Sequence, residues 1–211
     1  MLETLKSPLG GDLSISHYLW YNHYIMSDNV LSADNQQERP EQMMGYYIAG
    51  FVDGEGSFHV AVQKSANVKL GWQVIPEFHV SQNQTRTVVL EMIQKFLGCG
   101  YIKPNHRTRA NDHTNVYVVR NHHDLLEKVV PFFRKYELVS SKNEDFNKFA
   151  EIVEMMDQGS HLSREGLKKI FTTAFSMNNN GHYRKWRLND IIKALDSSET
   201  ICQNPVLADK I

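Results

Sequence analysis

The sequence predicts an α+β fold in which one helix, two strands, a second helix, two more strands and a group of helices follow one another. Three observations support this order. Polar and apolar residues alternate in two pairs of segments, which is the periodicity of half-buried strands. Apolar residues recur at helical spacing before, between and after these pairs. A glycine-rich stretch, residues 44–58, opens the domain and runs directly into the first predicted strand.

The chain of 211 residues is long enough for one domain with an appended segment. Residues 1–41 lack clear periodicity and are expected to form an appended, partly ordered N-terminal segment. Residues 42–178 form the predicted domain, and residues 179–211 a basic loop, a short helix and a tail. No apolar run approaches the roughly 18 residues that span a bilayer, so no membrane partner is expected.

The two cysteines, Cys99 and Cys202, provide neither a disulfide framework nor a zinc-binding spacing. An intracellular location is therefore expected, either a prokaryotic cytoplasm or an organelle. The ten histidines also lack a recognisable ligand spacing, which argues against a zinc nuclease.

The first predicted helix, at about residues 41–54, carries small residues that form a smooth stripe for close helix packing. They are Gly45, Ala49, Gly50 and Gly54. The helix ends in two acids, Asp53 and Glu55, although a helix C-terminus disfavours negative charge by about 0.3–1 kcal/mol per group. A divalent cation would compensate for this cost. A glycine-rich cap with solvated acids is the alternative.

The first strand pair is predicted at residues 57–65 and 71–82. Phe58, Val60, Val62, Val74, Phe78 and Val80 are expected to face inward, and His59, Gln63, Gln73, Ile75, Glu77 and His79 outward. Pro76 predicts a bulge or an edge position, because proline cannot donate a ladder hydrogen bond.

A helix at residues 85–97, stopped by Gly98, precedes a hairpin of residues 101–107 and 115–121. Lys103, Asn105 and Arg107 share one face of this hairpin. Further helices are predicted at residues 122–133, 142–157 and 163–177. Ser141 and Glu144 form a predicted capping box for the second of these helices, and Leu167, Ile170, Phe171 and Ala174 form the apolar stripe of the third.

Basic charge is concentrated in the predicted sheet. Residues 57–120 contain eight basic and three acidic residues, whereas residues 1–41 contain two basic and six acidic ones. A basic sheet on a chain of net charge -1 is the footprint expected of a surface that binds nucleic-acid phosphates.

The segment Ile48–Gly56, IAGFVDGEG, resembles the signature helix of the LAGLIDADG homing endonucleases, and Tyr47 and Ser57 also fit that pattern. The predicted order over residues 42–178 is similar to the α-β-β-α-β-β-α core of this family, with its curved antiparallel DNA-binding sheet. The sequence contains one signature helix. By resemblance, single-motif members are homodimers, which places Gly45, Ala49, Gly50 and Asp53 at the interface.

The resemblance implies a site-specific double-strand DNA endonuclease for intron or intein homing. Glu55 would bind Mg²⁺ with the Gly54 carbonyl for phosphodiester hydrolysis. Asp53 would mainly cap the helix interface, although a direct catalytic part stays open. Gln82 and Arg86 match family residues that order solvent and stabilise phosphate. Lys142, in the segment YELVSSKNEDF, matches a lysine for charge stabilisation or proton transfer, and Ser140 is the alternative register.

The outward side of the predicted sheet would bind a long pseudo-palindromic DNA duplex through its major groove. The candidate residues are His59, Gln63, Gln73, His79, Lys103, Asn105 and Arg107. Individually, each is also compatible with an ordinary solvated strand residue.

Two other functions stay open. An RNA maturase would use the same fold to assist a group I intron RNA, with reduced or lost DNA cleavage, and a DNA-binding regulator would bind without cutting. The basic segment 178–187 either contacts the DNA backbone or is a solvated loop.

Overall fold

The computed structural model describes residues 35–105, 113–178 and 184–202. The chain divides into two units, Met1–Met44 and Gly45–Ile211. The described elements are α2 (Asn35–Glu55), β1 (Gly56–Lys64), β2 (Trp72–Asn83), η1 (Gln84–Arg86), α3 (Val88–Leu97), β3 (Tyr101–Pro104), β4 (Thr114–Val119), α4 (His122–Asp124), η2 (Leu125–Val129), α5 (Val130–Lys135), α6 (Lys142–Asp157), η3 (Ser160–Leu162), α7 (Arg164–Phe175) and α8 (Leu188–Cys202). Among these helices, none combines the length and apolar character needed to cross a membrane.

The second unit is built on a four-stranded antiparallel sheet with strand order β1-β2-β4-β3. Phe58 lies opposite Phe78, and His59 lies opposite Glu77, so the two sides of the predicted strands keep their alternation across the pair. The α+β class and the order of helices and strands are therefore as the sequence predicts.

Pro76 lies in the stretch of β2 that is paired with only one of the described strands, β1. It faces Val60 of β1, whereas the pairing of β2 with β4 begins only at Phe78. The register between β1 and β2 continues without an inserted residue, so Pro76 makes no bulge there. Although β2 is an inner strand of the sheet, its stretch before Phe78 is unpaired on the β4 side among the described strands. The free side of this stretch accommodates the missing N–H of proline.

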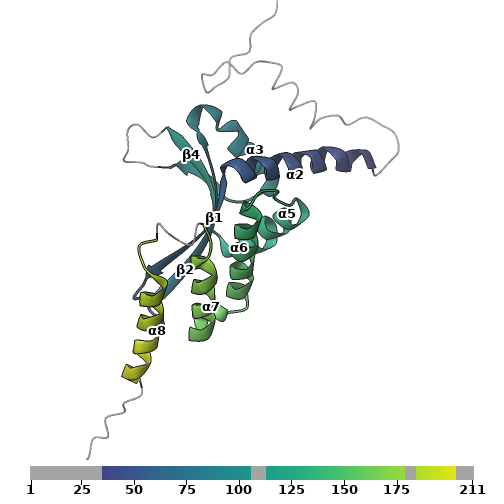
Figure 1. The fold of residues 1–211 in the computed structure, drawn as a ribbon. Coiled ribbons are helices and arrows are strands. Elements are labelled where there is room, and N and C mark those ends of the chain that lie inside the picture. The colour runs from purple at the N-terminus through teal and green to yellow at the C-terminus, as the bar shows by residue number, and fades with distance from the viewer. Residues whose placement is uncertain (1–34, 106–112, 179–183, 203–211) are drawn as a thin grey trace, which may run out of the picture. The chain divides into compact units, whose positions relative to one another are not determined.

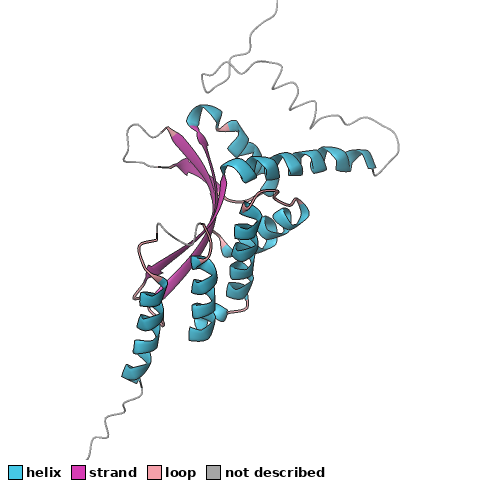
Figure 2. Cartoon of the chain, viewed as in Figure 1, coloured by secondary structure: helices cyan, strands magenta, loops and turns pink. Residues whose placement is uncertain are grey.

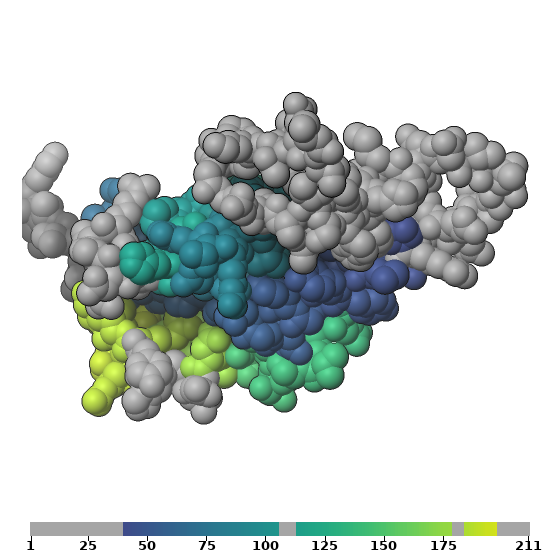
Figure 3. Space-filling model, turned by 90° about the horizontal axis from the view of Figure 1, so that it is seen from above, coloured from purple at the N-terminus to yellow at the C-terminus, as the bar shows by residue number. Residues whose placement is uncertain are grey.

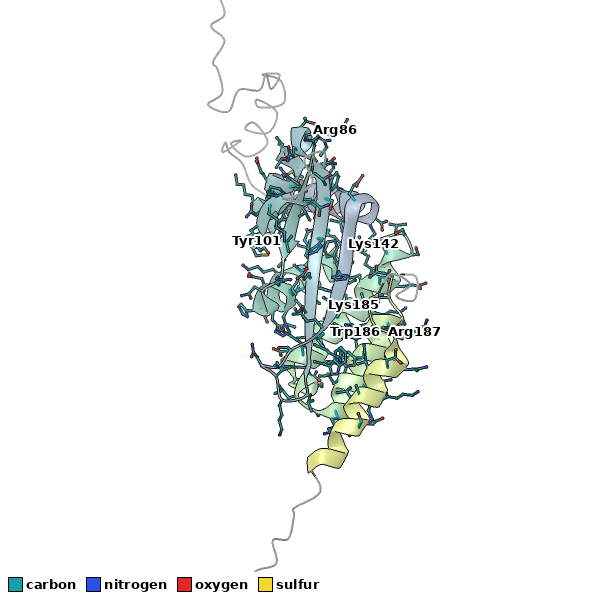
Figure 4. The ribbon with its side chains drawn as sticks, turned by 90° about the vertical axis from the view of Figure 1, so that its left-hand side faces the viewer. Arg86, Tyr101, Lys142, Lys185, Trp186 and Arg187 are labelled. Carbon is teal, nitrogen blue, oxygen red and sulfur yellow. The ribbon has the colours of Figure 1, made fainter. Side chains whose placement is uncertain are left out.

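Helices cover one side of the sheet. Figures 1 and 2 show α5, α6 and α7 gathered on the same side of the strands. The core between these layers is aromatic: the ring of Phe58 contacts the rings of Phe78, Phe133, Phe146 and Phe149 at centroid distances of 5.2–5.3 Å. Figure 4 looks onto the opposite side, where the strands are seen without a helix in front of them and α8 lies to one side.

Several helix boundaries differ from the sequence prediction. The helix α2 begins at Asn35 rather than at about residue 41, and Pro40 lies inside it. The predicted helix 122–133 is divided into α4, the π-helix η2 and α5, with Pro131 at the start of α5. Proline has no N–H to donate, which interrupts regular helical hydrogen bonding there.

The predicted capping box before α6 is wrong. Ser141 has a helical backbone conformation, and its side chain makes no capping hydrogen bond. A simple serine N-cap occurs instead at Ser163, whose side chain accepts from the N–H of Gly166 at the start of α7. The apolar stripe of α7 is buried as predicted: Leu167, Ile170, Phe171 and Ala174 are all nearly inaccessible.

Candidate active site

The C-terminal end of α2 is closed by a lysine from a distant part of the chain. Lys142 Nζ donates to the carbonyl oxygens of Val52, at 2.9 Å, and of Gly56, at 2.5 Å. A cation is favoured at this end of a helix. Lys142 therefore supplies part of the charge compensation that the sequence analysis assigned to a metal ion. Burial lowers the pKa of Lys142, while the carboxylates of Asp53, Glu55 and Asp145 oppose that shift.

Asp53 is engaged in structural hydrogen bonds. Its Oδ2 accepts from the backbone N–H groups of Val139, at 3.2 Å, and Ser140, at 2.9 Å. Its Oδ1 accepts from the Ser140 hydroxyl at 2.5 Å. Burial alone would raise the pKa of this carboxyl, but the hydrogen bonds from Ser140 and Val139 and the charge of Lys142 lower it overall. Ser140 and Lys142 thus both reach the end of α2, through different atoms.

Glu55 and Gly54 are exposed at the same helix end. A Cβ added at Gly54 would meet no atom within 4 Å, so a ligand can approach the backbone there closely. Both residues offer oxygen atoms, the donor type that Mg²⁺ prefers. Within the described ranges, no three His, Cys, Asp or Glu side chains form a metal-binding group.

The register of β1 and β2 places Gln82 near this helix end. Val80 pairs with Gly56, the residue that follows Glu55, and Gln82 lies two positions further along β2. Its Oε1 accepts from the backbone N–H of Asn83 at 2.8 Å. Arg86 is exposed in η1, which directly follows the end of β2 (Figure 4).

The small residues of α2 divide between two sides of the helix. Gly45 and Ala49 are buried, and a Cβ added at Gly45 would lie 2.3 Å from the ring of Tyr136. These two residues pack within their own chain, which corrects the expectation that they line a dimer interface. Gly50 is exposed with no atom within 4 Å of an added Cβ, and Tyr47 is 54% exposed. Figure 3 shows the blue surface of α2 beside the green surface of α5 and α6.

The outward side of the sheet carries most of the predicted DNA-contacting residues. Gln63 Nε2 donates to Gln73 Oε1 at 3.1 Å, and the rings of His59 and His79 lie 6.3 Å apart. Lys103 Nζ lies 5.8 Å from the centre of the Tyr101 ring at the other edge of the sheet.

Of the two other hairpin residues predicted to contact DNA, Asn105 and Arg107, the structure describes only Asn105. Asn105 follows the end of β3, and its backbone N–H donates to the Thr114 carbonyl at 2.8 Å. Arg107 lies outside the described residues.

An ionic network in the centre of this face was missed by the sequence analysis. Glu77 is only 7% exposed, although its strand position faces outward. It accepts from the Arg120 guanidinium and lies 2.8 Å from His79 Nε2. Arg120 comes directly after β4 and continues the alternation of Val116 and Val118, whose side chains share the outward face. This alternation could have placed Arg120 on the same face. Its contact with Glu77 of β2 was not evident from either segment alone.

Burial lowers the pKa of both imidazoles on this face. For His79, the nearby Glu77 opposes the shift, and Lys103 and Arg120 add to it. For His59, Arg184 and His79 lower the pKa further, and Glu77 opposes them. Both histidines therefore favour the neutral form, in which an imidazole can both donate and accept hydrogen bonds.

Comparison with known proteins identifies the family. The family model described as LAGLIDADG endonuclease matches residues 48–153. "Probable intron-encoded endonuclease 2" of Neurospora crassa is 33% identical over 149 residues, which are 70% of this chain and 30% of the relative. "DNA endonuclease I-CeuI" of Chlamydomonas moewusii is 32% identical over 57% of this chain and 56% of its own. The chain thus spans only about a third to a half of these curated relatives.

This chain matches two solved structures over nearly the whole length of each. The homing endonuclease I-TnaI is 40% identical, with a TM-score of 0.64, over 72% of this chain and 97% of its own. The archaeal intron-encoded homing endonuclease I-Vdi141I, complexed with DNA, is 32% identical, with a TM-score of 0.69, over 76% of this chain and 99% of its own. The signature helix, the sheet and the matched family model agree. This chain therefore belongs to the LAGLIDADG endonuclease family.

Proposed function

We propose that this protein is a homodimeric, Mg²⁺-dependent endonuclease that cuts both strands of one long, pseudo-palindromic DNA site. The observation that carries the proposal is the exposed pair Gly54 and Glu55 at the end of α2, beside a sheet face lined with polar and basic side chains. The DNA-bound relative and the intron-encoded relatives support the same substrate class.

The proposed dimer follows from the exposed side of α2. Tyr47, Gly50 and Gly54 lie at positions i, i+3 and i+7, which share one side of a helix, and all three are exposed in the protomer. Glycine at two of these positions permits a partner helix to approach closely. A two-fold axis along this side would bring the two Glu55 residues to one place.

Glu55 and the Gly54 carbonyl would hold the metal ion, together with oxygens of the partner and of the DNA. When bound, Mg²⁺ would supply a water activated for in-line attack on phosphorus and would stabilise the leaving 3′ oxygen. Two carboxylates brought together across a dimer repel each other, so a cation between them is favoured.

The remaining residues would prepare this site. Lys142 fixes the end of α2 through the carbonyls of Val52 and Gly56. Its positive charge would stabilise the negative charge that builds up on the phosphate. Gln82 would orient solvent, and Arg86 would neutralise backbone phosphate at the end of β2.

The test uses the purified protein, Mg²⁺ and genomic DNA that contains the uninterrupted target locus. Sequencing of the ends should reveal double-strand breaks at a single site, and we expect four-base 3′ overhangs. Glu55→Gln should abolish the breaks while DNA binding stays within about threefold, because the substitution removes a metal ligand and leaves the sheet unchanged.

Three results would contradict the proposal. Binding without cutting by the wild-type protein in Mg²⁺ would favour a DNA-binding regulator. Protection of a group I intron RNA without DNA breaks would favour the maturase. Equal loss of binding and cutting in Glu55→Gln would make Glu55 a structural residue.

A further inference from the structure

A segment beyond the matched family region lies along the edge of the sheet. The family model ends at residue 153, and the segment comprises residues 184–187. Arg184 donates to the carbonyl oxygens of Val60 on β1 and Ala174 on α7, both at 2.7 Å. Its guanidinium also lies 4.7 Å from the centre of the Phe175 ring. Because β1 is an edge strand, these contacts fasten the segment to an otherwise open side of the sheet.

Basic side chains lie around two tryptophan rings at this edge. The rings of Trp72 and Trp186 meet edge to face at 5.5 Å. Lys64 Nζ lies 4.8 Å from the centre of the Trp186 ring, and Lys185 Nζ lies 5.4 Å from it. Figure 4 shows Lys185, Trp186 and Arg187 together beside the strands. We call Lys64, Lys185, Trp186 and Arg187 the basic edge cluster.

The cluster borders a cavity that opens on the outward side of β1. The cavity has a volume of about 440 Å³, and its lining includes Ser57 and His59 of β1 with Lys185 and Trp186 of the segment. His59 belongs to the predicted DNA-contacting face. The cluster therefore continues that face beyond β1.

The charges of this cluster are not neutralised by neighbouring acids. Elsewhere in the described chain, basic side chains of the helical layer pair with carboxylates: Lys128 with Asp124, Arg134 with Glu154, Lys168 with Asp196 and Lys169 with Glu151. Lys64, Lys185 and Arg187 form no ion pair with any described residue, and all three are exposed. Aromatic rings hold an ammonium group in place and leave its charge available to an anion.

We propose that the basic edge cluster binds backbone phosphates of the DNA duplex on the outer flank of the stretch that lies on the sheet. This inference rests on the proposed function, because it requires a duplex on the outward face. Lys64, Lys185 and Arg187 contact phosphates, and Trp186 positions the two lysines. The contacts add affinity without reading bases, since phosphates carry no direct sequence information.

The test measures the salt dependence of binding to a mixed-sequence 50-base-pair duplex in EDTA, where no cutting occurs. The variant carries Lys64→Gln, Lys185→Gln and Arg187→Gln. The slope of log K against log salt should become shallower by roughly 0.9 for each phosphate that the variant no longer neutralises, or about 2.7 per protomer.

The matched control carries Lys128→Gln, Arg134→Gln and Lys169→Gln, which remove the same charge from ion-paired positions. Its slope should change by less than about 0.5, because these residues already have carboxylate partners. The double variant Lys185→Gln, Arg187→Gln should give about two thirds of the triple effect. Melting temperatures of all variants establish that the proteins are folded.

The outcomes separate this inference from the proposed function. If the wild-type protein shows no salt-dependent DNA binding, the proposed function fails and the cluster has no DNA to bind. If the wild type binds and cuts DNA while both triple variants change the slope equally, the cluster is an ordinary solvated surface and only this inference fails. A larger effect confined to the cluster variants supports it.

Discussion

Asp53 and Ser140 are joined by two hydrogen bonds, one from the Ser140 backbone N–H to Oδ2 at 2.9 Å and one from its hydroxyl to Oδ1 at 2.5 Å. They connect the last turn of α2 to the turn that precedes α6. Lys142 closes the same helix end through the Val52 and Gly56 carbonyls. Glu55 thus lies on a fixed helix end, which is what the proposed metal site requires.

Replacing Asp53 with Asn should lower the free energy of unfolding by about 1–2 kcal/mol at pH 7, because the hydrogen bonds to a charged acceptor are weakened. The pKa of Asp53 is lowered in the folded state from 3.8. Its stabilisation is therefore complete above pH 3.8 and is lost as the pH falls through the lower folded-state value.

Urea unfolding of wild type and Asp53→Asn between pH 7 and pH 2.5 measures this effect. The difference between the two proteins should stay constant at neutral pH and shrink only in the acid range. A difference that does not depend on pH would contradict the charged role of Asp53.

Removing the Lys142 ammonium with Lys142→Met should destabilise the fold by about 1–3 kcal/mol, because two carbonyls at the end of α2 lose their donor. DNA cleavage should fall at least tenfold, while binding through the sheet persists. Lys148→Met is the control on the same helix, since Lys148 Nζ donates to a single carbonyl, that of Ser176 at 2.9 Å. Equal cleavage by the two variants would show that Lys142 has no part in the site.

Gly50→Gln should convert the proposed dimer to a folded monomer. A side chain at Gly50 meets nothing within 4 Å in its own protomer, so the variant keeps or gains monomer stability through better helix propensity. Gly45→Ala should instead destabilise the protomer, because its Cβ would overlap the Tyr136 ring. Sedimentation equilibrium and thermal unfolding separate the two effects, and a dimeric Gly50→Gln protein would exclude this side of α2 as the interface.

His79→Gln should reduce the loss of stability between pH 7.5 and pH 5.5. Burial lowers the pKa of His79 below 6.5, so in this range the unfolded chain binds more protons than the folded one, and wild-type stability falls as the pH decreases. Guanidinium unfolding at several pH values measures the dependence. His123→Gln, which changes an exposed histidine on α4, serves as the control, and identical profiles for the two variants would refute the prediction.

Local patterns predicted much of the fold. Alternation placed β1 and β2 within one or two residues and assigned their buried side, and Gly98 stops α3 in the left-handed conformation expected of such a residue. The same patterns failed where a second element decides the outcome. Glu77 alternates outward, yet it is buried because Arg120, the residue after β4, and its neighbour His79 surround it.

The sequence alone determined the order of elements, the signature segment Ile48–Gly56 and the polar side of the first strand pair, because each depends on periodicity within one segment. Tertiary structure decided which glycines of α2 face inward, that Lys142 closes the helix end and that Arg184 fastens residues 184–187 to β1. Lys142 and Val52 are separated by 90 positions, and Arg184 and Val60 by 124. Such pairs form only when packed elements bring distant segments together, and periodicity within a segment carries no information about that partner.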